Sequence, residues 1–260
     1  IELPAVTFAQ AGTRTKTVII YLHKKVNNQN GIYMGVCEDI GYEVKERKGV
    51  PVKIQNGTND LPQISFQYIE TISKNIEESQ IFLNHPSCTM VLEKDLIGNF
   101  FTPSFYDADR LEIVQLLNLT GKSDKFEVKT LKELAVLDSK SKKRKRLNVT
   151  ENVKHVSLLH VNSKEFTIDF KEAENFEPIS KGTMCEVGEV LFAKLNPRIP
   201  RMVVVPASDY RLVCSNEFEI LVPRDNVTSY QLLLLLSSKI VDKQIQSLTS
   251  GTSSSHNRIK

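Results

Sequence analysis

Short apolar runs separated by turn residues dominate the first part of the chain and predict strands. Residues 17–22 (TVIIYL) and 32–36 (IYMGV) are rich in β-branched and aromatic side chains. Between them lies 27–31 (NNQNG), whose Asn and Gly residues favour a tight turn. We therefore predict a β-hairpin. The polar stretch from Gly41 to Gly57 is punctuated by Gly and Pro, which predicts a loop.

Signals for the start of a helix follow directly after this stretch. Asp60 can cap the helix, Pro62 suits the first turn, and Gln63 stands three residues after Asp60. We expect this helix to reach about Lys74. Residues 75–105 then mix polar and apolar side chains without a clear period, so a boundary between two units is expected there.

The second part of the chain alternates between candidate helices and strands, and the whole pattern predicts an α+β protein. A short helix is expected around 108–117, and 129–137 is typical of either a short helix or the start of a strand. Strand-like runs recur at 153–161, 166–170, 187–194, 202–205 and 218–222.

The strongest helix signal lies near the end of the chain. Thr228 and Gln231 form a capping box, in which each side chain satisfies a backbone donor of the first turn. An apolar face then runs through Leu232 and Leu236 to Ile245, at helical spacing. We predict one helix over this stretch, ended by a loop rich in Ser, Thr and Gly.

Composition narrows the class of protein. The hydrophobic fraction of 40% and the charged fraction of 25% suit a folded domain, and no apolar run approaches the ~18 residues of a membrane span. No signal peptide is recognisable, and the chain opens at Ile1 without an initiator Met, so we expect a piece of a longer protein. The four cysteines never form a CxxC motif, which predicts buried, reduced thiols and a cytoplasmic location.

Enzyme signatures are weak in this sequence. There is no HExxH, GxSxG, P-loop or GxGxxG motif. His155 and His160 are five residues apart in a predicted strand, so they are expected on opposite faces and suit a structural role. The Glu43/Lys45 and Glu127/Lys129 triplets match the carboxylate–lysine pattern of some nucleases, but such triplets arise easily by chance.

The distribution of charged residues favours a polyanion as the partner. Residues 1–100 carry ten Lys and Arg against eleven Asp and Glu, so the basic excess lies in residues 101–260. Residues 140–146 (KSKKRKR) hold six cations in seven positions, a density that stays solvated unless a polyanion neutralises it. The candidate phosphate anchor comprises Lys140, Lys142, Lys143, Arg144, Lys145 and Arg146. A disordered basic loop is the alternative interpretation.

Two turns could supply base contacts. In 194–201 (KLNPRIPR), two prolines stiffen a turn that carries Lys194, Asn196, Arg198 and Arg201. Arginine matches the major-groove edge of guanine bidentately, and Asn suits adenine. The second turn follows Cys214 and contains Ser215 and Asn216. Ser253, Ser254 and Arg258 lie in the Ser/Thr loop and could bind phosphates. Surface charge, turn capping and a plain linker remain the alternatives for these residues.

These stretches carry a family resemblance. GEVLFAKLNPRIPRMVVVP (188–206), CSNEFEILVP (214–223), YQLLLLLSSKIVDKQI (230–245) and SLTSGTSSSHNRI (247–259) occur in the order seen in target-recognition domains. The likeness is to the specificity subunits of type I restriction–modification systems and covers 107–260. It implies contact with double-stranded DNA through loops, and implies DNA-binding roles for the turn and loop residues named above.

The first part resembles the tail of the catalytic domain of adenine-specific DNA methyltransferases. The matching residues are AGTRTKTVIIYLHKK (11–25), GIYMGVCEDIGYEVKERKG (31–49) and NDLPQI (59–64). The resemblance implies the C-terminal strands of a methyltransferase-like α/β sheet over 1–80, a connecting segment over 81–106, and a mixed α/β recognition domain after it. The parent would use S-adenosylmethionine and act with methyltransferase or restriction subunits. The catalytic Asn/Asp-Pro-Pro-aromatic motif and the glycine-rich cofactor motif are absent, so no cofactor is expected in this chain.

The favoured hypothesis is therefore a sequence-specific DNA recognition module that directs adenine methylation, with cleavage by the parent left open. Two other classes stay open. The chain could be a protein-interaction module whose 232–245 helix docks a partner subunit. It could also retain a cryptic nuclease or methyltransferase activity.

Overall fold

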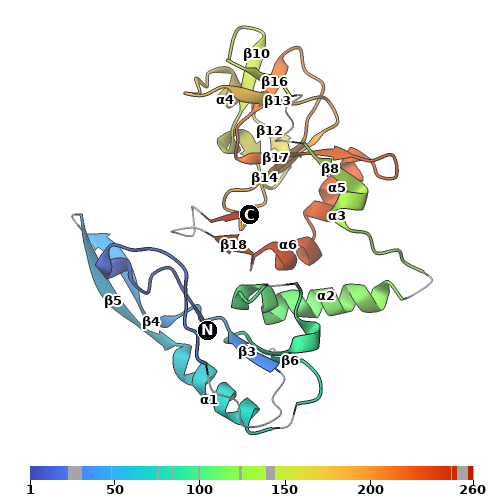
Figure 1. Cartoon of the computed structure of the whole chain (residues 1–260). Coiled ribbons are helices and arrows are strands. Elements are labelled where there is room, and N and C mark those ends of the chain that lie inside the picture. Colours follow the sequence, from blue (N-terminus) through green and yellow to red (C-terminus); the bar gives the residue numbers. More distant parts are fainter. Residues whose placement is uncertain are drawn as a thin grey trace. The chain divides into compact units, whose positions relative to one another are not determined.

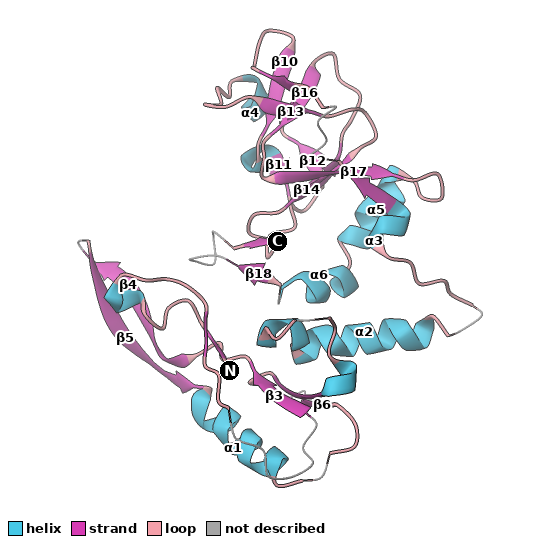
Figure 2. Ribbon diagram, in the orientation of Figure 1, coloured by secondary structure: helices cyan, strands magenta, loops and turns pink. Residues whose placement is uncertain are grey.

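The structure is a computed structural model that describes residues 1–22, 31–47, 49–74, 76–82, 85–98, 100–122, 125–138, 144–246, 248–250 and 257–259. The fold is mixed α+β, with six α-helices and several small sheets within these residues (Figures 1 and 2). The chain forms two compact units. Unit 1 comprises Ile1–Lys122 and Lys243–Asn257, and unit 2 comprises Ser123–Asp242 and Arg258–Lys260.

Unit 1 combines small antiparallel sheets with two helices. The pair β1–β2 and the hairpin β4–β5 each form a two-stranded sheet, and the third sheet has the order β3-β7-β6. The elements are β1 (Glu2–Leu3), β2 (Thr17–Val18), β3 (Gly31–Gly35), β4 (Ile40–Arg47), β5 (Val50–Asn59), α1 (Leu61–Ile72), β6 (Gln80–Phe82), β7 (Cys88–Leu92), α2 (Ala108–Thr120) and β18 (Thr249–Ser250). The division between the units falls inside α6 (Lys239–Gln246).

Two strand predictions for unit 1 were wrong. The expected hairpin between 17–22 and 32–36 is replaced by two separate pairings, β2 with β1 and β3 with β7. All five residues of β7 are buried. The burial gained by pairing β3 with this distant strand therefore outweighs the turn signal in the local sequence. The expected loop from Gly41 to Gly57 is the β4–β5 hairpin, in which Gly49 supplies the positive φ of the turn.

The helix predicted after Asp60 is confirmed as α1, but Asp60 plays another role. Its side chain makes no capping hydrogen bond. Instead, the Asp60 carboxylate accepts the backbone N–H groups of Glu38 and Asp39 at 2.9 and 2.8 Å, and His85 Nε2 lies 3.2 Å from it. This buried carboxylate therefore ties α1 to the segment between β3 and β4.

Residues 81–106 belong to unit 1 and do not separate two compact units. Val91 in this stretch packs with Met34 of β3 and with Tyr106 in one buried cluster. Asp107 then caps α2, since its carboxylate accepts the N–H groups of Asp109 and Arg110. The compact units divide after Lys122, while the domain limits implied by the family resemblance stay a prediction.

Unit 2 is built around two four-stranded sheets. One has the order β10-β16-β13-β9, with β10 parallel to β16, and the other has the antiparallel order β15-β14-β17-β8. The strands are β8 (Ala135–Leu137), β9 (Arg146–Leu147), β10 (Val153–Val156), β11 (Val161–Asn162), β12 (Thr167–Ile168), β13 (Gly182–Met184), β14 (Val190–Ala193), β15 (Met202–Val204), β16 (Arg211–Cys214), β17 (Phe218–Pro223) and β19 (Arg258–Ile259). The helices are α3 (Leu131–Leu134), α4 (Phe170–Glu174) and α5 (Ser229–Leu236).

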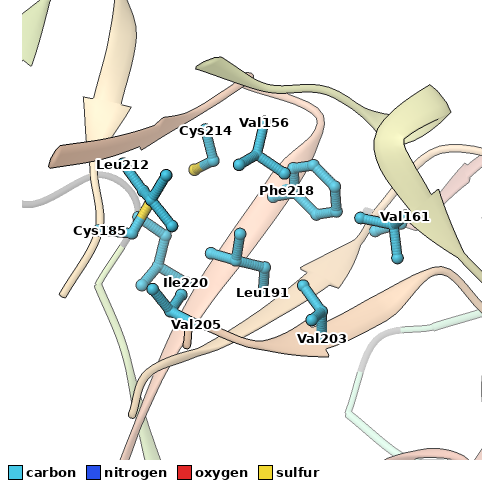
Figure 3. Close-up of a cluster of buried hydrophobic side chains, with 11 residues drawn as sticks. Val156, Val161, Cys185, Leu191, Val203, Val205, Leu212, Cys214, Phe218 and Ile220 are labelled. Atoms are coloured by element: carbon cyan, nitrogen blue, oxygen red, sulfur yellow. The ribbon is translucent and has the colours of Figure 1, made fainter. Parts of the chain in front are cut away.

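The core of unit 2 follows from the period-two pattern of its strands. Leu191 of β14 and Ile220 of β17 are directly opposite each other and fully buried. They point into one cluster with Leu212 and Cys214 of β16, so side chains of both sheets share this core (Figure 3). The alternate residues, such as Val190, pack on the other face of the second sheet in a separate cluster with α5.

The long helix predicted after Thr228 is two helices. The capping box of Thr228 and Gln231 is confirmed, and Leu232 and Leu236 are buried as expected. The helix ends at Leu236, and α6 begins at Lys239. The hydroxyls of Ser237 and Ser238 donate to carbonyls three residues earlier, a local bonding pattern that competes with helix continuation.

Candidate nucleic-acid interface

The turn at 214–217 links the two sheets of unit 2 and forms the centre of the candidate site. The strand β16 ends at Cys214 in one sheet, and β17 begins at Phe218 in the other. Two backbone hydrogen bonds hold the turn, from Ser215 N to Val156 O at 3.0 Å and from Phe218 N to Ser215 O at 3.2 Å. Asn216 is exposed at its tip.

The basic run reaches this turn through its last residue, Arg146. The strand order places Arg146 opposite Thr183, which is itself opposite Cys214. The Arg146 guanidinium donates to the Lys181 carbonyl at 2.7 Å and to Asn216 Oδ1 at 3.3 Å. Arg146 and Asn216, seventy residues apart in the sequence, therefore share one exposed surface.

Lys194 and Arg258 join the turn from two further segments. Lys194 N donates to the Glu217 carbonyl at 2.8 Å, and its ammonium lies 3.3 Å from the Glu219 carboxylate. The backbone of Arg258 bridges to Leu195, and the Arg258 guanidinium lies 2.6 Å from Glu217 Oε1. Arg146 and Arg258 thus reach the 214–217 turn through their guanidinium groups, and Lys194 meets it through its backbone.

Backbone hydrogen bonds hold the adjoining 194–201 turn. Asn196 adopts a positive φ of 50°, and its carbonyl accepts Ile199 N at 3.1 Å. Arg198 is exposed and Arg201 is half-buried. Ala193 N bonds to the Arg201 carbonyl at 2.9 Å, so the turn returns to the sheet at a fixed position. Both arginines are therefore carried by a well-defined backbone.

Arg144 does not fit the predicted phosphate anchor. Its side chain is only 10% exposed and bonds to Asp138 at 2.7 Å and to Glu189 at 2.5 and 3.0 Å. Burial alone lowers the pKa of Arg144, but the hydrogen bond and charge of Glu189, together with Asp138, outweigh it and raise that pKa. Lys145 and Arg146 are exposed. The candidates Lys140, Lys142, Lys143, Ser253 and Ser254 lie outside the described residues.

The sequence interpretation missed Lys181, Glu217 and Glu219. Lys181 is exposed, and its carbonyl accepts from Arg146. The two glutamates alternate with the buried Phe218 and Ile220. The alternation of polar and apolar residues in Glu-Phe-Glu-Ile could therefore have pointed to them. This surface offers guanidinium, ammonium and amide donors, which suit phosphate oxygens and base edges.

The two histidines of unit 2 are both buried, and the predicted opposite faces were wrong. Both rings contact Phe176, with centroid distances of 5.6 Å for His155 and 4.8 Å for His160. The strand ends at Val156 and a 3-10 turn intervenes, which removes the assumed alternation. Burial lowers the pKa of both imidazoles.

The catalytic alternatives find little geometric support. In each Glu-x-Lys triplet the two charges bind each other, at 2.7 Å for Glu43–Lys45 and 3.0 Å for Glu127–Lys129. No group of three His, Cys, Asp or Glu side chains arranged to hold a metal occurs within the described ranges. The four cysteines are free and buried, as predicted. The hydrogen bond with the Cys214 thiol, together with burial, raises the pKa of Cys185.

Two described glycines, Gly35 and Gly182, leave no room for an S-adenosylmethionine cradle. A cofactor cradle needs glycines whose missing side chains leave room for the ligand. Side chains fill that room at Gly35 and Gly182: a Cβ would lie 2.9 Å from Ile64 at the first and 2.5 Å from Val213 at the second. No step through this cofactor is therefore assigned to the chain.

No protein-family model matches the chain, and no curated protein matches it significantly. Among the helices that the structure describes, none has both the length and the apolar character to cross a membrane.

Proposed function

We propose that this chain is a double-stranded DNA recognition module of a restriction–modification methyltransferase, with the contact surface on unit 2. The observation that carries the proposal is the convergence at the 214–217 turn. Arg146 from the basic run, Lys194 from the end of β14 and Arg258 from the C-terminal segment all meet there. The sequence separates these cations, so only the fold makes them a surface.

The proposed division of roles follows from exposure and geometry. Arg146 and Lys145, both exposed, contact phosphates and position the duplex. Arg198, Arg201 and Asn216 stand on backbone turns fixed by hydrogen bonds and present planar donors to base edges. The module selects the site, and adenine flipping and methyl transfer belong to catalytic residues outside this sequence.

Selection of bound duplexes from a randomised library tests the proposal, followed by titration of the selected and a scrambled duplex at two salt concentrations. We expect a short motif and an affinity that falls as salt rises. Arg201→Ala should weaken cognate binding by about 1–3 kcal/mol and relax one base position. Lys164→Ala, at an exposed lysine in the β11–β12 turn, is the matched control. Salt-independent binding, or no selected motif, would reject the proposal.

A second candidate function has one specific observation in its favour. Helix α5 exposes Tyr230 and Leu234, at 68% and 66%, besides the face that it buries in unit 2. This apolar surface suits the docking of a methyltransferase or restriction subunit. Loss of partner binding in Leu234→Ser, with DNA affinity unchanged, would assign the helix to that role.

A further inference from the structure

The start of β17 and the turn before it place two carboxylates, Glu219 and Glu217, on the proposed DNA-binding surface. Phe218 and Ile220 point into the core at 1% and 0% exposure. Because side chains alternate along a strand, Glu219 lies on the opposite face of β17, and Glu217 immediately precedes that strand. Lys194 continues the pairing register of β14 and β17, in which Ala193 is opposite Phe218, so Lys194 lies opposite Glu217 on that same face.

Each of these carboxylates holds one of the candidate DNA-binding cations. Glu219 Oε2 lies 3.3 Å from Lys194 Nζ, and Glu217 Oε1 lies 2.6 Å from Arg258 Nη2. The Glu217 side chain is 29% exposed, whereas that of Arg258 is 57% exposed. Glu217 Oε2 is buried and has no hydrogen-bond partner among the described residues. The Glu217 carboxylate is therefore less accessible than the guanidinium that it binds.

A negative charge within a DNA-binding surface has two opposite effects. It orients the cation that it binds, which reduces the freedom that a contact with DNA would remove. It also repels any phosphate brought close to it, and such like-charge contacts suppress the wrong partners more than they weaken the right one. An acid in this position acts on specificity rather than on total affinity.

We propose that Glu217 is a specificity-determining residue of this surface, acting through Arg258. Glu217 holds the Arg258 guanidinium for one defined contact in the cognate complex. On non-cognate DNA the same ion pair keeps Arg258 from moving to the nearest phosphate, and the carboxylate opposes that phosphate. Glu217 is a positioning residue, and this role rests on the proposed DNA-binding function.

The test compares Glu217→Gln with the unmodified chain on the selected and the scrambled duplex. Gln keeps the shape of the side chain and removes its charge. We expect scrambled DNA to bind about five- to tenfold more tightly and cognate DNA to change less than twofold. Because the freed Arg258 neutralises one more phosphate, the log–log salt slope for scrambled DNA should steepen by about 0.9. A purely structural role for Glu217 would not change that slope.

Two further variants complete the design. Glu151→Gln removes the same charge from an exposed turn before β10, at the end of that strand remote from Cys214, and should leave the specificity ratio unchanged. Glu217→Gln combined with Arg258→Gln should lose the steeper salt slope, since the freed arginine is gone. Arg258→Gln alone, at an exposed residue, should weaken cognate binding more than tenfold and scrambled binding less than threefold.

The outcomes separate the two proposals. If the unmodified chain selects no motif, the DNA-binding function itself fails. If it selects a motif but Glu217→Gln keeps both the specificity ratio and the salt slope, the function stands and the role of Glu217 is wrong. Should Glu217→Gln not fold, an equal loss on both duplexes in Arg258→Gln would overturn the inference.

Discussion

Replacing Arg144 by Ala should destabilise unit 2 strongly, although this residue stands in the most basic run of the chain. Its guanidinium makes four short hydrogen bonds, to Asp138, to both oxygens of Glu189 and to the Met184 carbonyl. Glu189 is 7% exposed, and after the substitution it would keep one neutral partner, the N–H of Glu186. Removing one partner of a buried ion pair costs about 3–5 kcal/mol. Asp138 is 30% exposed and regains water, so we expect about 3 kcal/mol.

Denaturant unfolding of the full chain measures this loss, with Arg146→Ala as the control from the same run. The Arg146 side chain is exposed and bonds only to Lys181 O and Asn216 in the described structure, so its loss should cost under about 1 kcal/mol. Conversely, Arg146→Ala should reduce the salt slope of DNA binding by about 1. Equal destabilisation by the two substitutions would refute the assignment of Arg144 to the core. Joint replacement of Arg144 and Glu189 by Met and Leu should restore part of the stability.

Two more predictions concern the interior of unit 2. Burial lowers the pKa of His155 and His160 in the folded state, so the unfolded chain binds more protons below about pH 6.5; stability should therefore fall as the pH drops through that value. Unfolding free energies at pH 7.5 and 5.5 check this, and His155→Phe should flatten the dependence. Gly182→Ala should cost about 1–3 kcal/mol, since the new Cβ would lie 2.5 Å from Val213 and 2.8 Å from His155; an unchanged unfolding midpoint would contradict this.

The local elements of the fold were predictable where short-range chemistry decides them. Pro62 and the Thr228 capping box located the starts of α1 and α5, since caps act within one turn. The pairing of β3 was not predictable, because its partner β7 lies more than fifty residues away and is selected by burial. The β4–β5 hairpin was missed for the opposite reason: its Gly and Pro content resembles a loop, while its register is set by backbone pairing along the strands.

The charged residues of the candidate site were also only partly predictable from the sequence. Sequence reasoning selected the cations of the second part, and the structure does bring Arg146, Lys194 and Arg258 to one turn. It could not separate Arg144 from its neighbours, because a run of like residues gives no sign of which side chain turns inward. Sequence reasoning also missed the acidic residues, since DNA contacts are expected from positively charged side chains. Glu217 and Glu189 nevertheless decide how Arg258 and Arg144 are placed.

The Arg144–Glu189 and Arg258–Glu217 ion pairs differ in how exposed the arginine is, and we assign their roles from this difference. Glu189 and Arg144 are both about nine-tenths buried, so we assign this arginine to stability. Glu217 is half-buried and Arg258 is 57% exposed, so the same chemistry leaves a guanidinium that can still bind a ligand. A buried acid paired with a buried base stabilises the fold, whereas a half-buried acid paired with an exposed base orients a donor at the surface. By this criterion the 214–217 turn, which joins the two sheets and carries Glu217, is suited to present a cation in a defined direction.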